Sequence, residues 1–199
     1  MHQLILASQS ARRRHILKEQ GYEFSVHPLE LSEILKKNLT PIEQIRDLAL
    51  QKAKAAVAEL NSLKGQDILV LAADTVVLFE GQILGKPKNF QDAVQMLSQM
   101  SGKEHEVITA FCLWDLGRDC FVLEHDISKV CFRPLQKQEI IEYVESGEPM
   151  DKAGAYGIQG QGGKLVDRYE GSFQNIVGLP IEKLKEVLDK NGWSIRKKS

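Results

Sequence analysis

A nearly unbroken apolar run, LVLAADTVVLF, occupies residues 69–79 and contains one charged residue, Asp74. The run is rich in β-branched residues, so we expect a long strand over Ile68–Phe79. Burial of an isolated carboxylate is very costly, so Asp74 must be paired, bound to a metal or placed near an exposed strand end. We interpret it as a functional residue, because carboxylates in apolar settings gather at active sites. The alternative is a structural Asp bonded to a nearby turn.

Segments with strand-like and helix-like patterns alternate along the chain, which is typical of an α/β fold. Turns at Glu80-Gly81 and around Gly117 predict hairpins, so the sheet should be mixed. With 199 residues and 43% hydrophobic content, the chain can bury a normal core, and we expect a single domain over residues 1–199. The expected strands cover residues 3–7, 22–27, 68–79, 82–84, 106–116, 120–132, 164–168 and 193–195, and the expected helices cover 10–20, 40–60, 90–100, 136–146 and 180–190.

Charge and composition argue against several classes of partner. The net charge of −1 creates no overall field toward nucleic acid or membrane, and no segment approaches transmembrane length. The apolar run near the N-terminus has only four residues, too few for a signal peptide. Cys112, Cys120 and Cys131 form no CxxC pair and are odd in number, which suggests reduced core residues in a cytoplasmic protein.

The segment Asp151–Gly163, DKAGAYGIQGQGG, contains five glycines in thirteen positions. Glycine lets a ligand approach the main chain closely, and the charged and amide groups between the glycines can pair with phosphates or a base edge. A plain linker would favour Ser and Pro and would lack the packing anchors Tyr156 and Ile158. We therefore interpret the segment as a shaped binding loop.

The segment LASQSARRR at residues 6–14 places two serines and adjacent arginines where a strand ends and a helix begins. The start of a helix attracts phosphate, to which Ser8 and Ser10 add hydroxyl donors and Arg12 and Arg13 add forked cationic donors. The alternative is an ordinary N-cap at Ser10 with solvated arginines.

Other candidate residues carry weaker signals. Lys86 lies between Gly85 and Pro87, and Lys52 lies close to the apolar stripe of its helix, where a lysine can simply extend along the core. Glu33 has no strong local signal. The segment GSFQNIVGLP, residues 171–180, is typical of a tight turn before a capped helix and is more architectural than catalytic.

Taken together, these motifs resemble the Maf family of nucleotide pyrophosphatases over nearly the whole chain. The glycine-rich match is specific, and each of the others is weak alone. The motifs are, in order, Ser8-x-Ser10-x-Arg12-Arg13, Lys52 in LAxxKA, Ala73-Asp74-Thr75, Gly85-Lys86-Pro87, DKAGAYGIQG from Asp151 to Gly160, and Gly171-Ser172…Val177-Gly178-Leu179-Pro180. Two departures, Ala11 in place of a proline and Ala110 in place of a glycine, remove no catalytic group.

The resemblance implies a mixed twisted sheet with flanking helices, related in shape to the inosine triphosphate pyrophosphatases, with two lobes around a nucleotide cleft. It implies hydrolysis of nucleoside triphosphates to monophosphate and pyrophosphate with Mg²⁺ or Mn²⁺, and it is compatible with a homodimer. The implied residues are Asp74, Lys86, Lys52 and Glu33 for catalysis, Asp74 and Glu33 for the metal, and Ser8, Ser10, Arg12, Arg13, Thr75, Gln159 and Lys152 for substrate binding and specificity.

The pairs Asp74-Thr75 and Ile158-Gln159 resemble the branch of the family that acts on dTTP and UTP. The sister branch, which acts on 7-methyl-GTP, has Gln after the Asp, and this chain does not. Two alternatives stay open from the sequence: activity on 7-methyl-GTP, and a non-catalytic nucleotide-binding regulator of cell division. Both the clearing of non-standard nucleotides and the control of pyrimidine pools fit the expected activity.

Overall fold

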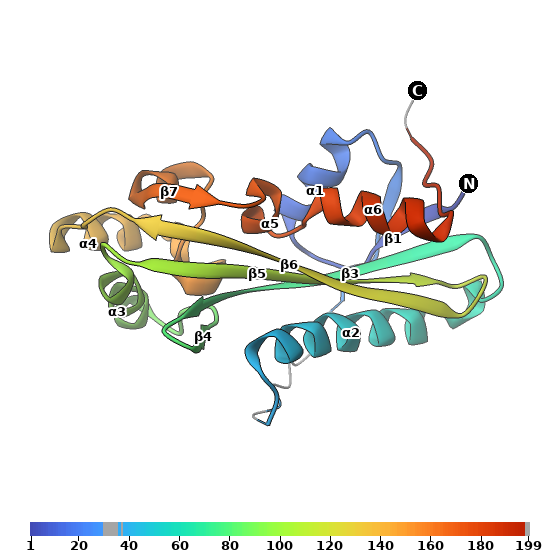
Figure 1. Cartoon of the computed structure of the whole chain (residues 1–199), viewed down its shortest axis with the longest axis horizontal. Helices are drawn as coiled ribbons and strands as arrows, with labels where there is room; N and C mark the ends of the chain where they lie inside the picture. The colour runs from blue at the N-terminus through green and yellow to red at the C-terminus, as the bar shows by residue number, and fades with distance from the viewer. Residues whose placement is uncertain (30–35, 37, 198–199) are drawn as a thin grey trace. The chain divides into compact units, whose positions relative to one another are not determined.

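The structure is a computed structural model that describes residues 1–29, 36 and 38–197. Its strands are β1 (Gln3–Leu6), β2 (Phe24–Val26), β3 (Ile68–Phe79), β4 (Gln82–Leu84), β5 (Glu104–Asp115), β6 (Cys120–Phe132) and β7 (Val166–Glu170). They form one seven-stranded sheet of order β2-β1-β3-β5-β6-β7, with β4 paired to β3 (Figure 1). β1 is parallel to β2 and β3, whereas the β3–β4 and β6–β7 pairs are antiparallel, which confirms the predicted mixed sheet.

Six α-helices accompany the strands in the described ranges. They are α1 (Ala11–Glu19), α2 (Pro41–Glu59), α3 (Phe90–Met100), α4 (Lys137–Glu145), α5 (Phe173–Val177) and α6 (Ile181–Asn191). A capping box begins α2: Thr40 Oγ1 accepts from the Glu43 backbone N–H, and the Glu43 carboxylate accepts from the Thr40 N–H. No helix in the part of the chain that the structure describes is both long and apolar enough to cross a membrane.

The chain forms two compact units. The first takes the described parts of Met1–Asp74, Thr109–Asp126 and Gly178–Ser199, and the second takes Thr75–Ile108 and Ile127–Val177. The boundary falls within β3, so Asp74 belongs to the first unit and Thr75 to the second.

In the first unit, helices cover both faces of the sheet. Figure 1 shows α2 on one side of the strands, and α1 and α6 on the other. The alanines Ala53 and Ala56 of α2 are fully buried, and such small side chains let a helix approach the strands closely. The core on this side consists of Ile5, Ala7, Ala53, Ala56, Val57, Ile68, Val70, Ala72, Cys112 and Leu116.

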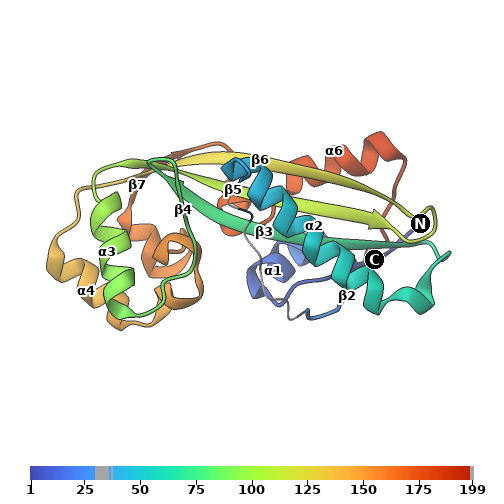
Figure 2. The same cartoon turned by 90° about the horizontal axis from the view of Figure 1, so that it is seen from below.

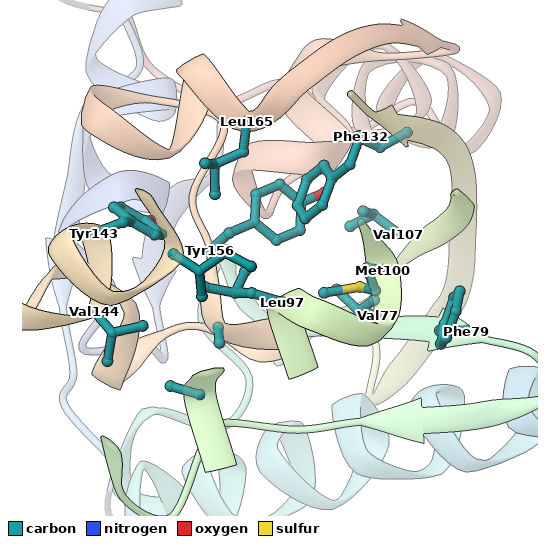
Figure 3. Close-up of a cluster of buried hydrophobic side chains, with 14 of the residues drawn as sticks. Val77, Phe79, Leu97, Met100, Val107, Phe132, Tyr143, Val144, Tyr156 and Leu165 are labelled. Atoms are coloured by element: carbon teal, nitrogen blue, oxygen red, sulfur yellow. The ribbon is translucent and has the colours of Figure 1, made fainter. Parts of the chain in front are cut away.

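In the second unit, a separate core lies between α3, α4 and the ends of the long strands. Figure 2 shows α3 and α4 side by side, and Figure 3 shows the side chains that meet there, including Leu97, Phe132 and Tyr156. Phe132 and Tyr156 make an edge-to-face contact with ring centroids 4.7 Å apart, and His105 contacts both rings. Tyr156, in the glycine-rich segment, is therefore a core anchor, as predicted.

Three sequence expectations are wrong. Residues 171–180, expected to form a tight turn, contain the short helix α5. Residues 193–195 form no strand, and only Ile195 bridges to His2. Trp193 is buried, so its apolar character reflects packing rather than strand pairing. The expectation that all three cysteines lie in the core holds for Cys112, whose burial raises the pKa of its thiol to about 12, but Cys120 is exposed.

Candidate functional site

Lys52 and Asp74 form an ion pair in the first unit, with 2.6 Å between Nζ and Oδ1. α2 supplies the lysine and β3 supplies the carboxylate. The side chains are only 17% and 12% exposed, so solvent screens the pair weakly. Of the arrangements that the sequence allowed for Asp74, the structure contains the paired one. A carboxylate held this way keeps its orientation, which suits a base or a metal ligand.

The serine and arginine motif organises the start of α1. Ser10 is the N-cap, and its Oγ accepts from the Arg13 backbone N–H at 3.3 Å. The Arg13 side chain is buried: its Nη1 donates to Ser8 Oγ at 3.1 Å and its Nε donates to the Gly178 carbonyl at 2.8 Å. The alternative of solvated arginines is therefore wrong for Arg13, whereas Arg12 is half-buried.

In the second unit, the Lys86 turn is hydrogen-bonded to the glycine-rich segment. The Gly154 N–H donates to the Gly85 carbonyl at 3.0 Å, and Lys86 itself is exposed. Gly154 has φ +66°, and a Cβ there would lie 2.7 Å from Val77 Cγ2. Only glycine accommodates both the positive φ and the lack of space for a Cβ. These two conditions give a local structural reason for the glycine at position 154 of the DKAGAYGIQG motif.

Lys152 is held inside the glycine-rich segment. Its Nζ donates to the Glu148 carbonyl at 2.5 Å and pairs with Asp151 Oδ1 at 2.7 Å. A Cβ on Gly157 would lie 2.8 Å from Lys152 Cε, so the lysine stem lies directly against this glycine. These contacts orient the ammonium group toward protein oxygens.

The two residues that are predicted to select the base, Gln159 and Thr75, also lie in the second unit. Gln159 is exposed and directly precedes a short 3₁₀ turn at Gly160–Leu165. Thr75 is half-buried and directly follows Asp74 in β3. The predicted nucleotide cleft stays a prediction.

Glu33 lies outside the described residues. Within residues 1–29, 36 and 38–197, no three His, Cys, Asp or Glu side chains form a group that could hold a metal ion. Of the two predicted metal ligands, the structure therefore describes one carboxylate, that of Asp74, whose Oδ1 accepts a hydrogen bond from Lys52 Nζ. Mg²⁺ is commonly held by one or two carboxylates together with substrate phosphates and water, so this donor set fits an ion bound mainly through the substrate.

Two residues that the sequence reading did not select lie beneath the glycine-rich segment. Tyr143 on α4 and Glu148 just after it hydrogen-bond to each other and to three backbone N–H groups of the segment. The only local signal is the position of Glu148 between Gly147 and Pro149, two residues that are typical of a helix end.

Comparison with known proteins gives consistent matches over nearly the full length. The sequence model of the Maf family, described as Maf-like protein, matches residues 3–191. The chain is 51% identical over 187 residues to a Bdellovibrio bacteriovorus protein named dTTP/UTP pyrophosphatase, covering 94% of this chain and 97% of that one. It is 46% identical over 185 residues to an Aquifex aeolicus protein of the same name, covering 93% of each.

Among solved structures, a HAM1 protein from Coxiella burnetii has a similar fold. The TM-score is 0.50 at 18% sequence identity, and the match covers 96% of this chain and all of that one. At this identity the match speaks to the fold alone, and it confirms the predicted mixed α/β architecture.

Proposed function

The chain belongs to the Maf family, as the match over residues 3–191 shows, and on this premise we propose that it hydrolyses dTTP and UTP to the monophosphate and pyrophosphate. Water adds to the phosphate chain as the α–β phosphoanhydride bond breaks. The substrate class follows from relatives up to 51% identical that are named dTTP/UTP pyrophosphatase. The observation that carries the chemistry is the mostly buried Lys52–Asp74 pair.

We assign Asp74 the central role. It would either accept the proton of the attacking water or ligate a divalent metal, and both roles need an ionised, oriented carboxylate. Lys52 would hold that carboxylate in place at 2.6 Å and add positive charge near the developing phosphate charge. Loss of either side chain should therefore reduce turnover.

The cations of the motifs would bind the triphosphate. Phosphoryl chemistry of this kind depends mostly on positioning and charge neutralisation. Arg12 and Lys86 would contact phosphate oxygens. Ser8, Ser10 and Arg13, which are hydrogen-bonded to one another, would fix the first turn of α1 from which Arg12 projects. Lys152 would add charge from the glycine-rich segment.

A divalent cation, Mg²⁺ or Mn²⁺, is part of the proposal. When bound, it would neutralise phosphate charge and polarise the scissile bond. Asp74 would hold it together with substrate oxygens, and Glu33 is the second proposed ligand. Isothermal titration with Mg²⁺ and a non-hydrolysable nucleotide, on the wild type and on Asp74→Asn, tests this assignment.

Base selection would fall to Thr75 and Gln159. A glutamine amide presents one donor and one acceptor, which match a pyrimidine carbonyl and N–H. A polar reader left unpaired by the wrong base discriminates strongly. We expect dTTP and UTP to be preferred over ATP, GTP and 7-methyl-GTP.

The test is a panel of nucleoside triphosphates with detection of released pyrophosphate. Preferential turnover of dTTP and UTP supports the proposal. Preference for 7-methyl-GTP would assign the chain to the sister activity, and nucleotide binding without pyrophosphate release would indicate a non-catalytic regulator. A cytoplasmic location, a single domain, a homodimer and the lack of a nucleic-acid or membrane partner stay predictions from the sequence.

A further inference from the structure

The Glu148 side chain lies under the glycine-rich segment and accepts three hydrogen bonds. Oε1 accepts from the Tyr143 hydroxyl at 3.1 Å and from the Gly162 N–H at 3.2 Å, and Oε2 accepts from the Gln161 N–H at 3.2 Å. Three donors converge on one half-buried carboxylate. Such charge-assisted bonds are roughly twice as strong as neutral ones, so this side chain is a firm anchor for the backbone above it.

Tyr143 supplies a second anchor on the other side of Gln159. Its hydroxyl donates to Glu148 and accepts from the Gly157 N–H at 3.3 Å. Its ring belongs to the core of the second unit, as Figure 3 shows, so the hydroxyl is held by packing. The backbone is therefore tied down two residues before Gln159 and again two and three residues after it.

The glycines of the segment make this close approach possible. Gly160 has φ +75°, and a Cβ there would lie 3.1 Å from Glu148 Oε2. A Cβ on Gly162 would lie 2.5 Å from the Tyr143 hydroxyl. The main chain thus folds directly onto the Glu148–Tyr143 pair, with no side chain between.

We propose that Glu148 is a positioning residue for base selection: with Tyr143 it fixes the backbone on both sides of Gln159 and so sets the direction of that side chain. This inference rests on the proposed function, in which Gln159 reads the base. A carboxylate suits the task because it only accepts, and all three of its partners donate. A glutamine at this position would turn an –NH₂ group toward at least one of those donors and lose that contact.

The test is Glu148→Gln, assayed for the ratio of kcat/KM for UTP to that for GTP. We expect this ratio to fall by about tenfold, the scale of one lost hydrogen bond to a charged group. The matched control is Glu145→Gln, which removes the same charge from an exposed position near the end of α4 and should leave the ratio unchanged.

A double-mutant cycle separates positioning from general damage. If Glu148 acts through Gln159, then Glu148→Gln in the Gln159→Ala background should cause little further loss of the ratio. Full additivity of the two changes would overturn the inference. Amide hydrogen exchange gives a readout without activity: the Gln161 and Gly162 amides should exchange faster in Glu148→Gln, and unchanged exchange would also overturn it.

Tyr143→Phe is the second variant, and it decides the matter if Glu148→Gln does not fold. It keeps the ring in the core but removes the hydroxyl, so the ratio should fall and the Gly157 amide should exchange faster. An unchanged ratio in Tyr143→Phe would overturn the inference. A wild-type enzyme without preference for UTP would instead contradict the proposed function, so the two failures are distinguishable.

Discussion

The Lys52 ammonium lies 2.6 Å from the Asp74 carboxylate and links α2 to β3 at the residue where the first segment of the first unit ends. Both side chains are mostly buried. Removing one partner from such a pair leaves the other charge partly desolvated, which is costly. Substitution of either residue should therefore destabilise the protein more than the same substitution at an exposed neighbour.

Asp74→Asn should nearly abolish turnover of UTP while the protein still unfolds cooperatively. The amide keeps the shape and can still accept from Lys52, but it cannot serve as a base or a strong metal ligand. Steady-state kinetics and thermal unfolding measure the two effects. Asp67→Asn, an exposed position just before β3, is the control and should behave as wild type. Near wild-type kcat in Asp74→Asn would remove the residue from the mechanism.

Lys52→Met should lower kcat/KM for UTP by more than about tenfold, because a hydrogen bond to a charged group contributes about 1.5–3 kcal/mol. Methionine retains an apolar stem against the core and removes the ammonium. Lys54→Met, an exposed lysine on the same helix, is the matched control. Equal losses in the two variants would show that general helix charge, and not the contact with Asp74, matters.

Elements with strong local end signals could be predicted closely from the sequence. The bounds of β3, α3 and β6 agree with the expected ranges, because turns, caps and uniform periodicity define them locally. The glycine-rich segment is different. It folds into 3₁₀ turns at Ala153–Ala155 and Gly160–Leu165, and part of this shape is set by Glu148 and Tyr143. Tertiary contacts of that kind leave no periodic pattern in the sequence, so the shape of this segment could not be predicted from it.

The candidate site could be predicted in part. The sequence indicated that Asp74 needs a partner, because burial of a lone charge is unfavourable. The identity of that partner, Lys52, depends on how α2 packs against β3, and the two residues are 22 positions apart in the chain. Lys52 had only a weak signal of its own, and its selection came from the family resemblance. The burial of Arg13 against Gly178 joins residues 165 apart and had no local signal.

Lys86→Ala should lower kcat/KM by more than about tenfold with little change in melting temperature, because the side chain is exposed and would contact a phosphate. Lys88→Ala, two residues further along and also exposed, is the control for loss of one positive charge. A large drop in melting temperature with unchanged kinetics would instead indicate a structural role for Lys86.

His105 should make the stability of the fold sensitive to acid. Burial lowers the pKa of His105 to about 4 from its usual 6.5, and its Nε2 lies 2.8 Å from the Tyr156 hydroxyl. As pH falls below about 6.5, the unfolded chain takes up a proton that the folded protein does not bind until about pH 4. The free energy of unfolding therefore decreases across that window, by at most roughly 3 kcal/mol from this group.

Denaturant unfolding at pH 7 and pH 4.5 measures this effect. The wild type should lose more stability between the two pH values than His105→Gln, which has no imidazole to protonate. His15→Gln is the control, because that side chain is 64% exposed and is solvated in both states. The same loss in wild type and His105→Gln would show that other groups dominate the acid response.

Gly162→Ala should destabilise the protein through a steric clash alone. The added Cβ would lie 2.5 Å from the Tyr143 hydroxyl and would also meet the Gly157 carbonyl oxygen. Overpacking of this kind costs about 1–3 kcal/mol. For a chain of this size, that lowers the melting temperature by about 2–4 °C per kcal/mol. Gly85→Ala is the matched control, because a Cβ there has nothing within 4 Å. Equal melting temperatures for the two variants would mean that the glycine-rich segment can shift away from Tyr143 at little cost, and hydrogen exchange at the Gly157 amide would then show whether its bond to the hydroxyl survives.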